Sequence, residues 1–185
     1  MTVFETLRLI AAEVTDEDVP ELLDVYLSNP AYLELTEGSG GVAGAYDRGM
    51  LERDLAMSAL TPGRHTAVLR LRDDGACVGI LDWIDENPND GAPWLGLIMI
   101  HADRQQRGLA GEAVAGLAEH GRAAGWTRLR EGVLEGNDAG MALARSAGMG
   151  EVERKRHRVA AGDRELAVME LDLSVLPGTP RDRSR

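Results

Sequence analysis

The stretch Trp94-Leu-Gly-Leu-Ile-Met-Ile100, followed by His101-Ala-Asp-Arg-Gln-Gln-Arg-Gly-Leu-Ala-Gly111, decides the fold of this chain. Its first seven residues are apolar on both sides of a strand alternation, which is typical of a central strand covered on both faces. A short polar turn follows, and apolar side chains then return at helical spacing over 108–124. The sequence therefore predicts a buried strand, a tight turn and a helix that opens on a glycine.

The turn between this strand and this helix has the composition of an anion-binding site. The first N–H groups of a helix lack intrahelical partners and carry partial positive charge, so they bind phosphate groups. Small or basic side chains stand at Arg104, Arg107, Gly108, Ala110 and Gly111. Two common phosphate motifs do not fit, because Glu112 stands where a P-loop needs lysine and the dinucleotide pattern Gly-x-Gly-x-x-Gly is absent.

Around this unit, the hydrophobic patterns predict a mixed α/β (α+β) domain built on one sheet. Strands are expected over 5–14, 65–72, 77–84, 94–100, 127–134, 152–159 and 165–173. Helices are expected over 15–29, 46–60, 108–124 and 138–146, in the order β-α-α-β-β-β-α-β-α-β-β. With 185 residues and no internal repeat, we expect a single domain over 1–176 and a polar tail over 177–185.

Charge and composition exclude several classes of function. The formal net charge of −11 disfavours nucleic acid and anionic membranes as partners, and the basic run Arg154–Arg158 is typical of a solvated strand face. The single cysteine, Cys77, excludes an intrachain disulfide and a multi-cysteine zinc site, and no metal site is expected. The sequence has no apolar run of about 20 residues and no signal-peptide profile, which predicts a cytoplasmic protein.

Two sequence blocks resemble the GNAT superfamily of acyl-CoA-dependent N-acetyltransferases. The first is the family's Gln/Arg-x-x-Gly-x-Gly/Ala turn, which Gln105, Gly108 and Ala110 satisfy. The second is the segment from Asn137 to Met149, which is similar to the family's Asn-x-x-x-x-x-Leu-x-x-x-x-Gly-Phe element with methionine in place of phenylalanine. The resemblance covers about 5–173. The opening Thr6-Leu-Arg-Leu9, the capping signature Thr15–Asp18 and the charged final hairpin resemble the branch that contains ribosomal-protein N-terminal acetyltransferases.

The resemblance implies a mostly antiparallel central sheet flanked by helices, with acetyl-CoA as cosubstrate. It implies that the turn from Gln105 to Gly111 holds the pyrophosphate through backbone amides, and that the end of the preceding strand pairs with the pantetheine arm and polarises the thioester carbonyl. The implied cofactor contacts are Ile98, Met99, Ile100, Gln105, Gln106, Arg107, Gly108, Leu109, Ala110, Gly111 and Asn137. Asn137 has a second interpretation, as the N-cap of the helix over 138–146.

The implied reaction is direct attack of a neutral amine on the thioester, which needs a base for the ammonium proton. The positions that supply the acid and the base in the family hold other residues here. Ala144 replaces the usual tyrosine, Gly140 the serine of the ribosomal branch, and Trp94 and Gly96 the strand carboxylate or histidine. A thiol with a pKa near about 8.5 leaves without a dedicated acid, so catalysis is not excluded.

The base is therefore sought among carboxylates that reach the site through water. Asp82 is the first candidate, because a hairpin register around the 85–92 loop would place it on the same face as Gly96. Glu135 and Glu131 on the next strand are rivals. For each of the three, a solvated or salt-bridged carboxylate is the competing interpretation.

The acceptor is expected to be a primary amine of a small molecule or of a peptide N-terminus. Tyr26, Tyr32 and Tyr46 are candidates for the wall of an acceptor pocket, although core or surface packing explains each of them as well. His101 ends the central strand and is expected in a turn, on the face opposite to Trp94.

Two alternatives to an enzyme stay open at this point. The missing tyrosine and strand carboxylate favour a non-catalytic acyl-CoA-binding or sensing module. A phosphate-binding domain unrelated to coenzyme A would require both sequence blocks to be coincidental. The final hairpin and the C-terminal segment are expected contacts of a possible homodimer.

Overall fold

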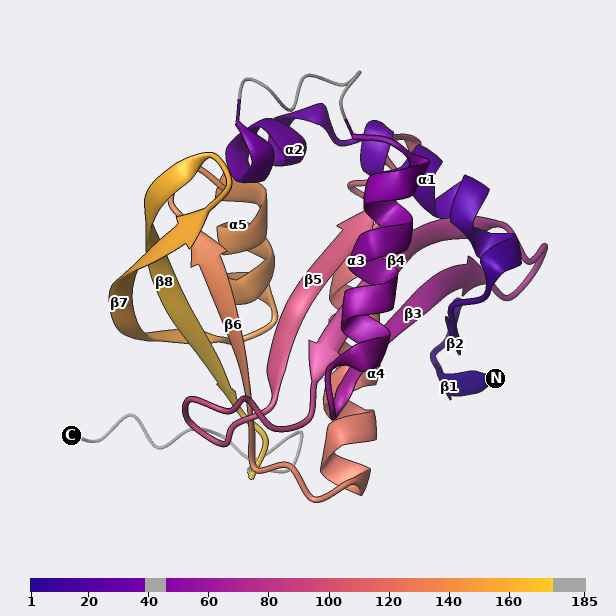
Figure 1. Ribbon diagram of the computed structural model, residues 1–185. Coiled ribbons are helices and arrows are strands. Elements are labelled where there is room, and N and C mark those ends of the chain that lie inside the picture. Colours follow the sequence, from indigo (N-terminus) through magenta and orange to yellow (C-terminus); the bar gives the residue numbers. More distant parts are fainter. Residues whose placement is uncertain (39–45, 175–185) are drawn as a thin grey trace.

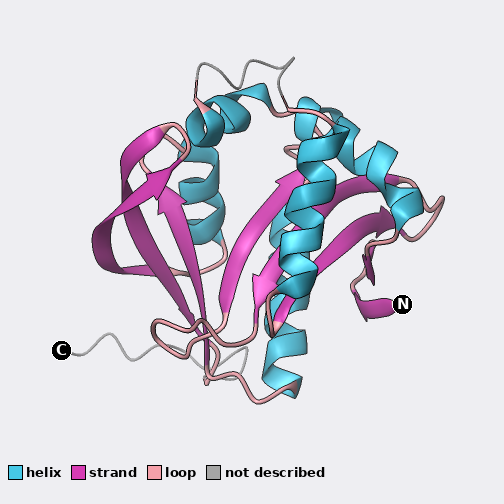
Figure 2. Ribbon diagram, viewed as in Figure 1, coloured by secondary structure: helices cyan, strands magenta, loops and turns pink. Residues whose placement is uncertain are grey.

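The computed structural model describes residues 1–38 and 46–174, so the predicted tail over 177–185 lies outside the described residues. These residues form one eight-stranded sheet with helices on both faces (Figures 1 and 2). The strands are β1 (Thr2–Glu5), β2 (Leu9–Glu13), β3 (Arg64–Leu71), β4 (Cys77–Ile84), β5 (Trp94–Ile100), β6 (Arg128–Leu134), β7 (Gly150–Val159) and β8 (Gly162–Asp172). The helices are α1 (Val19–Leu27), α2 (Pro30–Glu37), α3 (Arg48–Leu60), α4 (Leu109–Ala123) and α5 (Asp138–Ser146), with short 3-10 turns η1 (Asp16–Asp18) and η2 (Ala102–Arg104). None of the helices in this described part is long and apolar enough to cross a membrane.

The sheet is mixed and mostly antiparallel, which confirms the predicted fold class. Its strand order is β1-β2-β3-β4-β5-β6-β8-β7, and only β5 and β6 run parallel to each other. One face buries a cluster that includes Leu117 of α4 and Ala144 of α5, and the other face packs α1, α2 and α3 through Leu22, Leu33 and Leu51. The buried face of each helix thus fixes its position over the sheet.

The central pair of strands separates soon after it forms. β5 and β6 share only the register pairs Trp94↔Arg130 and Leu95↔Glu131, and Figure 1 shows the two strands diverging beyond them. A bulge in β5 lies at the same place, because Leu95 and Leu97 face consecutive residues of β4. A bulge bends its strand and increases the local twist, which accounts for the separation.

Two elements differ from the prediction. The single strand expected over 5–14 is wrong, because the chain reverses after β1 and returns as β2. The Thr6 backbone N–H donates to the Leu9 carbonyl (2.9 Å), and the Thr6 hydroxyl accepts from the Leu9 N–H (3.0 Å). No helix was expected directly after Asn29, yet Pro30 begins α2, since a proline at the first helical position needs no N–H partner. The bounds of β4, β5 and α5 agree with the predicted ranges.

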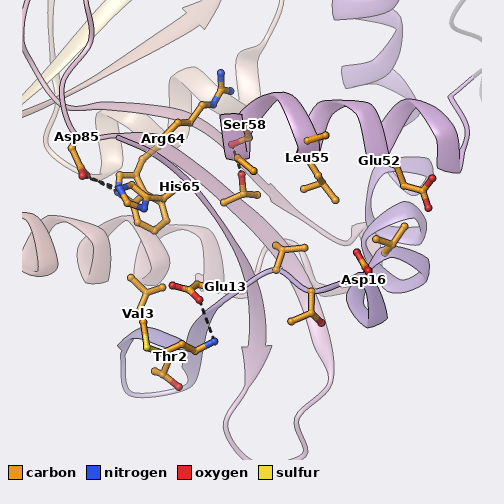
Figure 3. A pocket seen from close by; sticks show the side chains of 18 of the residues that line it. Thr2, Val3, Glu13, Asp16, Glu52, Leu55, Ser58, Arg64, His65 and Asp85 are labelled. Carbon is orange, nitrogen blue, oxygen red and sulfur yellow. Dashed lines mark hydrogen bonds and ion pairs between the residues drawn. The ribbon is translucent and has the colours of Figure 1, made fainter. Parts of the chain in front are cut away.

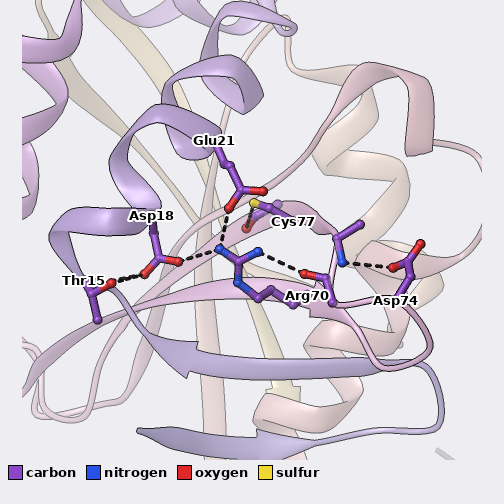
Figure 4. A network of polar contacts seen from close by, with 9 residues as sticks. Thr15, Asp18, Glu21, Arg70, Asp74 and Cys77 are labelled. Carbon is purple, nitrogen blue, oxygen red and sulfur yellow. Dashed lines mark hydrogen bonds and ion pairs between the residues drawn. The ribbon is translucent and has the colours of Figure 1, made fainter.

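Polar contacts hold α1 against the sheet beside the cluster that includes Leu22. The Arg70 guanidinium on β3 donates to Asp18 (2.6 Å) and to Glu21 (2.5 Å), and Asp18 in turn accepts from Thr15 (Figure 4). Burial alone would raise the pKa of the Asp18 carboxyl, but the hydrogen bonds from Arg70 and Thr15 outweigh it and lower that pKa. The capping signature predicted at Thr15–Asp18 therefore also attaches the start of α1 to β3.

Candidate active site

The divergence of β5 and β6 opens a cleft of about 800 Å³. Ten of the eleven predicted cofactor residues line it: Ile98, Met99, Ile100, Gln105, Gln106, Gly108, Leu109, Ala110, Gly111 and Asn137. The eleventh, Arg107, turns its guanidinium to the Asp103 carbonyl (Nη2–O 3.0 Å). The fold therefore brings the two sequence blocks, which lie far apart along the chain, to the same cleft.

The turn between β5 and α4 is held by specific contacts. Gln105 Nε2 donates to the carbonyl at the end of β5 (2.9 Å) and to Asn29 Oδ1 (2.7 Å). Gln106 and Gly108 have φ values of +61° and +77°, and the glycine caps α4 without a side chain. A Cβ added to Gly111 would meet no atom within 4 Å. α4 thus begins without a side-chain cap and with open space at its first turn, as an anion site requires.

The edge of β5 that faces the cleft offers main-chain groups to an extended ligand. From Leu97 to Ile100 the strand pairs with β4 on one edge, while its pairing with β6, as far as the described residues go, ends at Leu95. An extended arm can add to such an edge as a further strand. This geometry agrees with the role that the family resemblance implies for Ile98–Ile100.

Asn137 caps α5, as its second interpretation predicted. Its Oδ1 accepts from the Gly140 N–H (2.9 Å), and the same side chain lines the cleft. A Cβ at Gly140 would lie 2.6 Å from Asn137 Nδ2, so a serine at that position would collide with the cap. A serine at this position would therefore require the Asn137 side chain to shift from its capping position.

Asp82 lies where the register argument placed it, but donors already surround its carboxylate. A Cβ at Gly96 would be 2.6 Å from Asp82 Oδ1, so the two residues share a face. The carboxylate is 5% exposed and accepts hydrogen bonds from Ser58 Oγ (3.0 Å), Thr66 Oγ1 (2.8 Å) and Arg64 Nε (3.0 Å). Asp82 does not line the cleft. Its contacts are those of a structural ion pair and hydrogen bonds that join β4 to β3 and α3, in which Asp82 is buried and Arg64 is half-exposed.

Glu131 is the one carboxylate among the three predicted bases that lines the cleft. It is 8% exposed, and its Oε2 atom is buried with no hydrogen-bond partner among the described residues. Burial raises the pKa of this carboxyl group to about 7. Glu131 lies opposite Leu95, where the pairing of β5 with β6 ends. A carboxyl group with a pKa near 7 exchanges protons at neutral pH, as a general base must.

The remaining candidates divide between the cleft and the rest of the fold. Glu135 is exposed and lies outside the cleft lining. Tyr32 on α2 lines the cleft, and burial raises the pKa of its hydroxyl to about 12. Tyr26 and Tyr46 stack on each other with ring centroids 4.9 Å apart and belong to the core, as their packing interpretation predicted. His101 caps η2, as expected of a turn histidine.

A second groove, of about 1180 Å³, lies between α3 and the β1–β2 hairpin (Figure 3). His65 stands in it, with Nε2 2.8 Å from Asp85 Oδ2 and its ring stacked on Trp83 at a centroid distance of 5.0 Å. This groove shares no lining residue with the cleft between β5 and β6. None of the predicted cofactor or base residues lines it, so the smaller cleft is the candidate active site.

Solved structures of acetyltransferases share this fold. An acetyltransferase from Thermus thermophilus has 26% sequence identity and a TM-score of 0.68, over 92% of this chain and 100% of that chain. RimJ from Mycobacterium smegmatis, in complex with CoA-disulfide, has 18% identity and a TM-score of 0.78, over 95% and 90%. Spermidine N-acetyltransferase from Vibrio cholerae, in complex with CoA and spermine, has 13% identity and a TM-score of 0.68, over 90% and 96%.

The fold and the cleft define the class of protein as an acyl-CoA-dependent N-acyltransferase. The sequence model of the acetyltransferase (GNAT) domain matches residues 8–150, and the chain belongs to this family. No curated protein matches the sequence significantly. The resemblance carried by the Gln105 and Asn137 blocks is therefore confirmed, together with acetyl-CoA as the cosubstrate.

Proposed function

We propose that the chain transfers an acetyl group from acetyl-CoA to a primary amine within the cleft between β5 and β6, with Glu131 as the general base. One observation carries this assignment: the buried Glu131 Oε2, which has no hydrogen-bond partner within residues 1–38 and 46–174, lies in the same cleft as the turn at the start of α4. A buried carboxylate without donors is costly for folding. In this cleft, the ammonium group of the acceptor would supply the missing partner of the carboxylate.

The cofactor placement follows from the two polar features of the cleft. The pyrophosphate would lie against the first turn of α4, beside the open space at Gly111. The pantetheine arm would extend along the free edge of β5, from Ile100 toward Leu95. This direction leads the thioester from the α4 turn toward Glu131, which lies opposite Leu95.

The reaction needs two proton transfers. The acceptor arrives as an ammonium, and the Glu131 carboxylate takes its first proton. The neutral amine then attacks the thioester carbonyl carbon, and a backbone N–H of β5 stabilises the negative charge that develops on the carbonyl oxygen. The C–S bond breaks as the amide forms, and the second N–H proton passes to the thiolate. Because a thiol has a pKa near about 8.5, Ala144 at the position of the family tyrosine does not prevent this step.

Asp82 and Glu135 are weaker candidates for the base. An ammonium would have to displace Arg64 from Asp82, and it would gain little because the carboxylate already has three kinds of donor. Glu135 is exposed and lies outside the cleft lining, so its carboxylate is not placed to take a proton from an amine bound there. Both stay predictions that direct substitution can test.

The acceptor enters the cleft beside α2. Tyr32 and Leu35 of α2 contribute apolar surface there, and the charged lining residues are Arg104, Glu131 and Asp138. We propose a singly charged primary amine, either a small monoamine or a peptide N-terminus of the kind that the ribosomal branch modifies. A polyamine would need more counter-charges than this lining provides.

We further propose a cytoplasmic homodimer. β7 is the last strand of the sheet, and its residues from Gly150 to Arg158 are exposed. Such an edge strand offers unpaired main-chain groups to a second copy. The single thiol, Cys77, is free, as is usual in a reducing compartment.

Thiol release from acetyl-CoA tests the proposed function. The protein is incubated with acetyl-CoA and a panel of monoamines and short peptides, and free thiol is followed over time. We expect release that depends on the acceptor and that falls about 100-fold in Glu131→Gln but less than threefold in the exposed control Glu135→Gln. Tight binding of CoA with no acceptor-dependent release across the panel would instead support the non-catalytic acyl-CoA-binding module.

A further inference from the structure

The turn between β1 and β2 reaches the start of α4. Arg8, in this turn, donates from Nη1 to the Arg107 carbonyl (3.0 Å) and from Nε to Glu112 Oε2 (2.6 Å). Its Nη2 would lie 3.5 Å from a Cβ at Gly108. One guanidinium therefore joins the N-terminal hairpin to the carbonyl before the helix cap and to the first turn of the helix.

Within the described part of the chain, the hydrogen-bond donors to the Glu112 carboxylate all come from this turn. Glu112 Oε1 accepts from Thr6 Oγ1 (2.6 Å) and from the Arg8 backbone N–H (2.7 Å), while Oε2 takes the Arg8 guanidinium. Burial alone would raise the pKa of the Glu112 carboxyl, but these hydrogen bonds outweigh it and hold that pKa below its ordinary value. Glu112 thus carries a full negative charge one residue after Gly111, and the Arg8 charge balances it.

This carboxylate conflicts with the binding of an anion. A negative side chain in the first turn of a helix interacts with the same partial positive charge that attracts a phosphate. Left unpaired, Glu112 would repel a pyrophosphate at the α4 turn. The Arg8 contact removes that repulsion, and its bond to the Arg107 carbonyl holds the backbone just before Gly108.

We propose that Arg8 is a positioning residue for acetyl-CoA, which neutralises Glu112 and fixes the Arg107 carbonyl so that the pyrophosphate meets a preformed, unopposed helix N-terminus. The proposal rests on the placement of the pyrophosphate at this turn. It gives the Thr6-Leu-Arg-Leu9 opening a physical role, since Thr6 and Arg8 are the two residues that hold Glu112.

Arg72 provides a matched control. It follows β3 and contacts the same N-terminal hairpin, with Nη1 2.8 Å from the Thr6 carbonyl and Nη2 3.2 Å from Glu5 Oε2. Its side chain is 47% exposed, against 45% for Arg8. Arg72 thus makes one carbonyl contact and one ion pair, as Arg8 does, but none of its hydrogen bonds or ion pairs among the described residues reaches the turn before α4.

The experiment compares Arg8→Ala, Arg72→Ala and Arg8→Ala/Glu112→Gln with the unchanged protein. Steady-state rates give kcat and KM for acetyl-CoA, and calorimetry gives the affinity for CoA at low and high salt. Arg8→Ala is expected to raise the KM for acetyl-CoA about tenfold, which corresponds to about 1.4 kcal/mol, with kcat unchanged. The double variant should recover a large part of this loss, because the uncompensated charge is gone. High salt should reduce the difference between Arg8→Ala and the unchanged protein.

Three outcomes would overturn the proposal. Equal KM values in Arg8→Ala and Arg72→Ala would show that the contact with the turn has no effect on the cofactor. A lower kcat at unchanged KM would place the effect elsewhere, and the absence of any recovery in the double variant would exclude the charge argument. Gly111→Asp serves as the reference for the site itself. If this variant binds CoA normally, the pyrophosphate placement fails, whereas loss of binding in Gly111→Asp beside an unaffected Arg8→Ala refutes only the role of Arg8.

Discussion

Replacement of Glu131 by glutamine should lower activity and raise stability in the same protein. Burial holds the pKa of this carboxyl near 7 in the folded state, against an ordinary value of 4.5. Between these two values the folded state binds more protons than the unfolded state, so stability falls as pH rises toward 7 and then stays low. The difference corresponds to about 3 kcal/mol above pH 7.

Glu131→Gln removes this penalty. We expect its Tm to exceed that of the unchanged protein by about 5 °C or more at pH 8, and the difference to shrink toward pH 5. The activity should move in the opposite direction, because glutamine cannot take the ammonium proton. We expect kcat to fall about 100-fold and to lose the rise with pH that is centred near pH 7 in the unchanged protein.

Thermal unfolding and pH–rate profiles over pH 5–9 measure both effects. Glu135→Gln is the control, since this exposed carboxylate lies four residues further along and outside the cleft. The reasoning is refuted if Glu131→Gln retains both its rate and the inflection near pH 7. An unchanged Tm difference between pH 5 and pH 8 would show that the Glu131 carboxyl has an ordinary pKa.

Three further predictions concern Asp82, Tyr32 and the charge of the acceptor. Asp82→Asn should destabilise the fold by about 2 kcal/mol in chemical denaturation, because it weakens the hydrogen bonds that the buried carboxylate accepts from Ser58, Thr66 and Arg64. At temperatures where the variant is folded, its kcat should stay within about threefold of that of the unchanged protein. A large loss of kcat in a folded Asp82→Asn variant would instead identify Asp82 as the general base. Tyr32→Ala should raise the KM for the amine several-fold with the KM for acetyl-CoA within about twofold, and equal changes in both would contradict a wall on the acceptor side. A monoamine should have a kcat/KM about tenfold above that of spermidine, since Glu131 and Asp138 are the only carboxylates in the described lining. A higher kcat/KM for spermidine than for the monoamine would contradict the proposal of a singly charged acceptor.

The sequence was most informative where structure depends on local pattern. The apolar run of β5, the glycine-rich start of α4 and the Asn137 cap each have a nearby physical cause, and these elements lie as expected. The correct family followed from the same segments. α2 was missed because Asn-Pro, which usually ends a helix, also begins one when proline occupies the first position.

The chemistry was harder to predict because it depends on contacts between distant segments. The register argument placed Asp82 on the Gly96 face, but the donors that occupy its carboxylate come from α3 and β3. Glu131 lies between the buried Leu129 and Val133 in the alternation of β6, so the strand pattern places it on the buried face, but its position in the cleft depends on where β5 and β6 separate. The contact between Arg8 and Glu112 joins residues 104 positions apart.

Calorimetric titration of acetyl-CoA into the unchanged protein and into Gly111→Asp tests the central claim most directly. The new side chain has open space in the fold, and an acidic residue in the first turn stabilises a helix, so the variant should keep or slightly raise its Tm. Its charge would stand where the pyrophosphate is proposed to bind, and Gly111→Asn controls for size without charge. We predict that the unchanged protein binds acetyl-CoA and that Gly111→Asp loses at least about 100-fold in affinity, or about 2.7 kcal/mol, well beyond the loss in Gly111→Asn. Equal affinity in all three proteins would contradict the placement of the cofactor in this cleft.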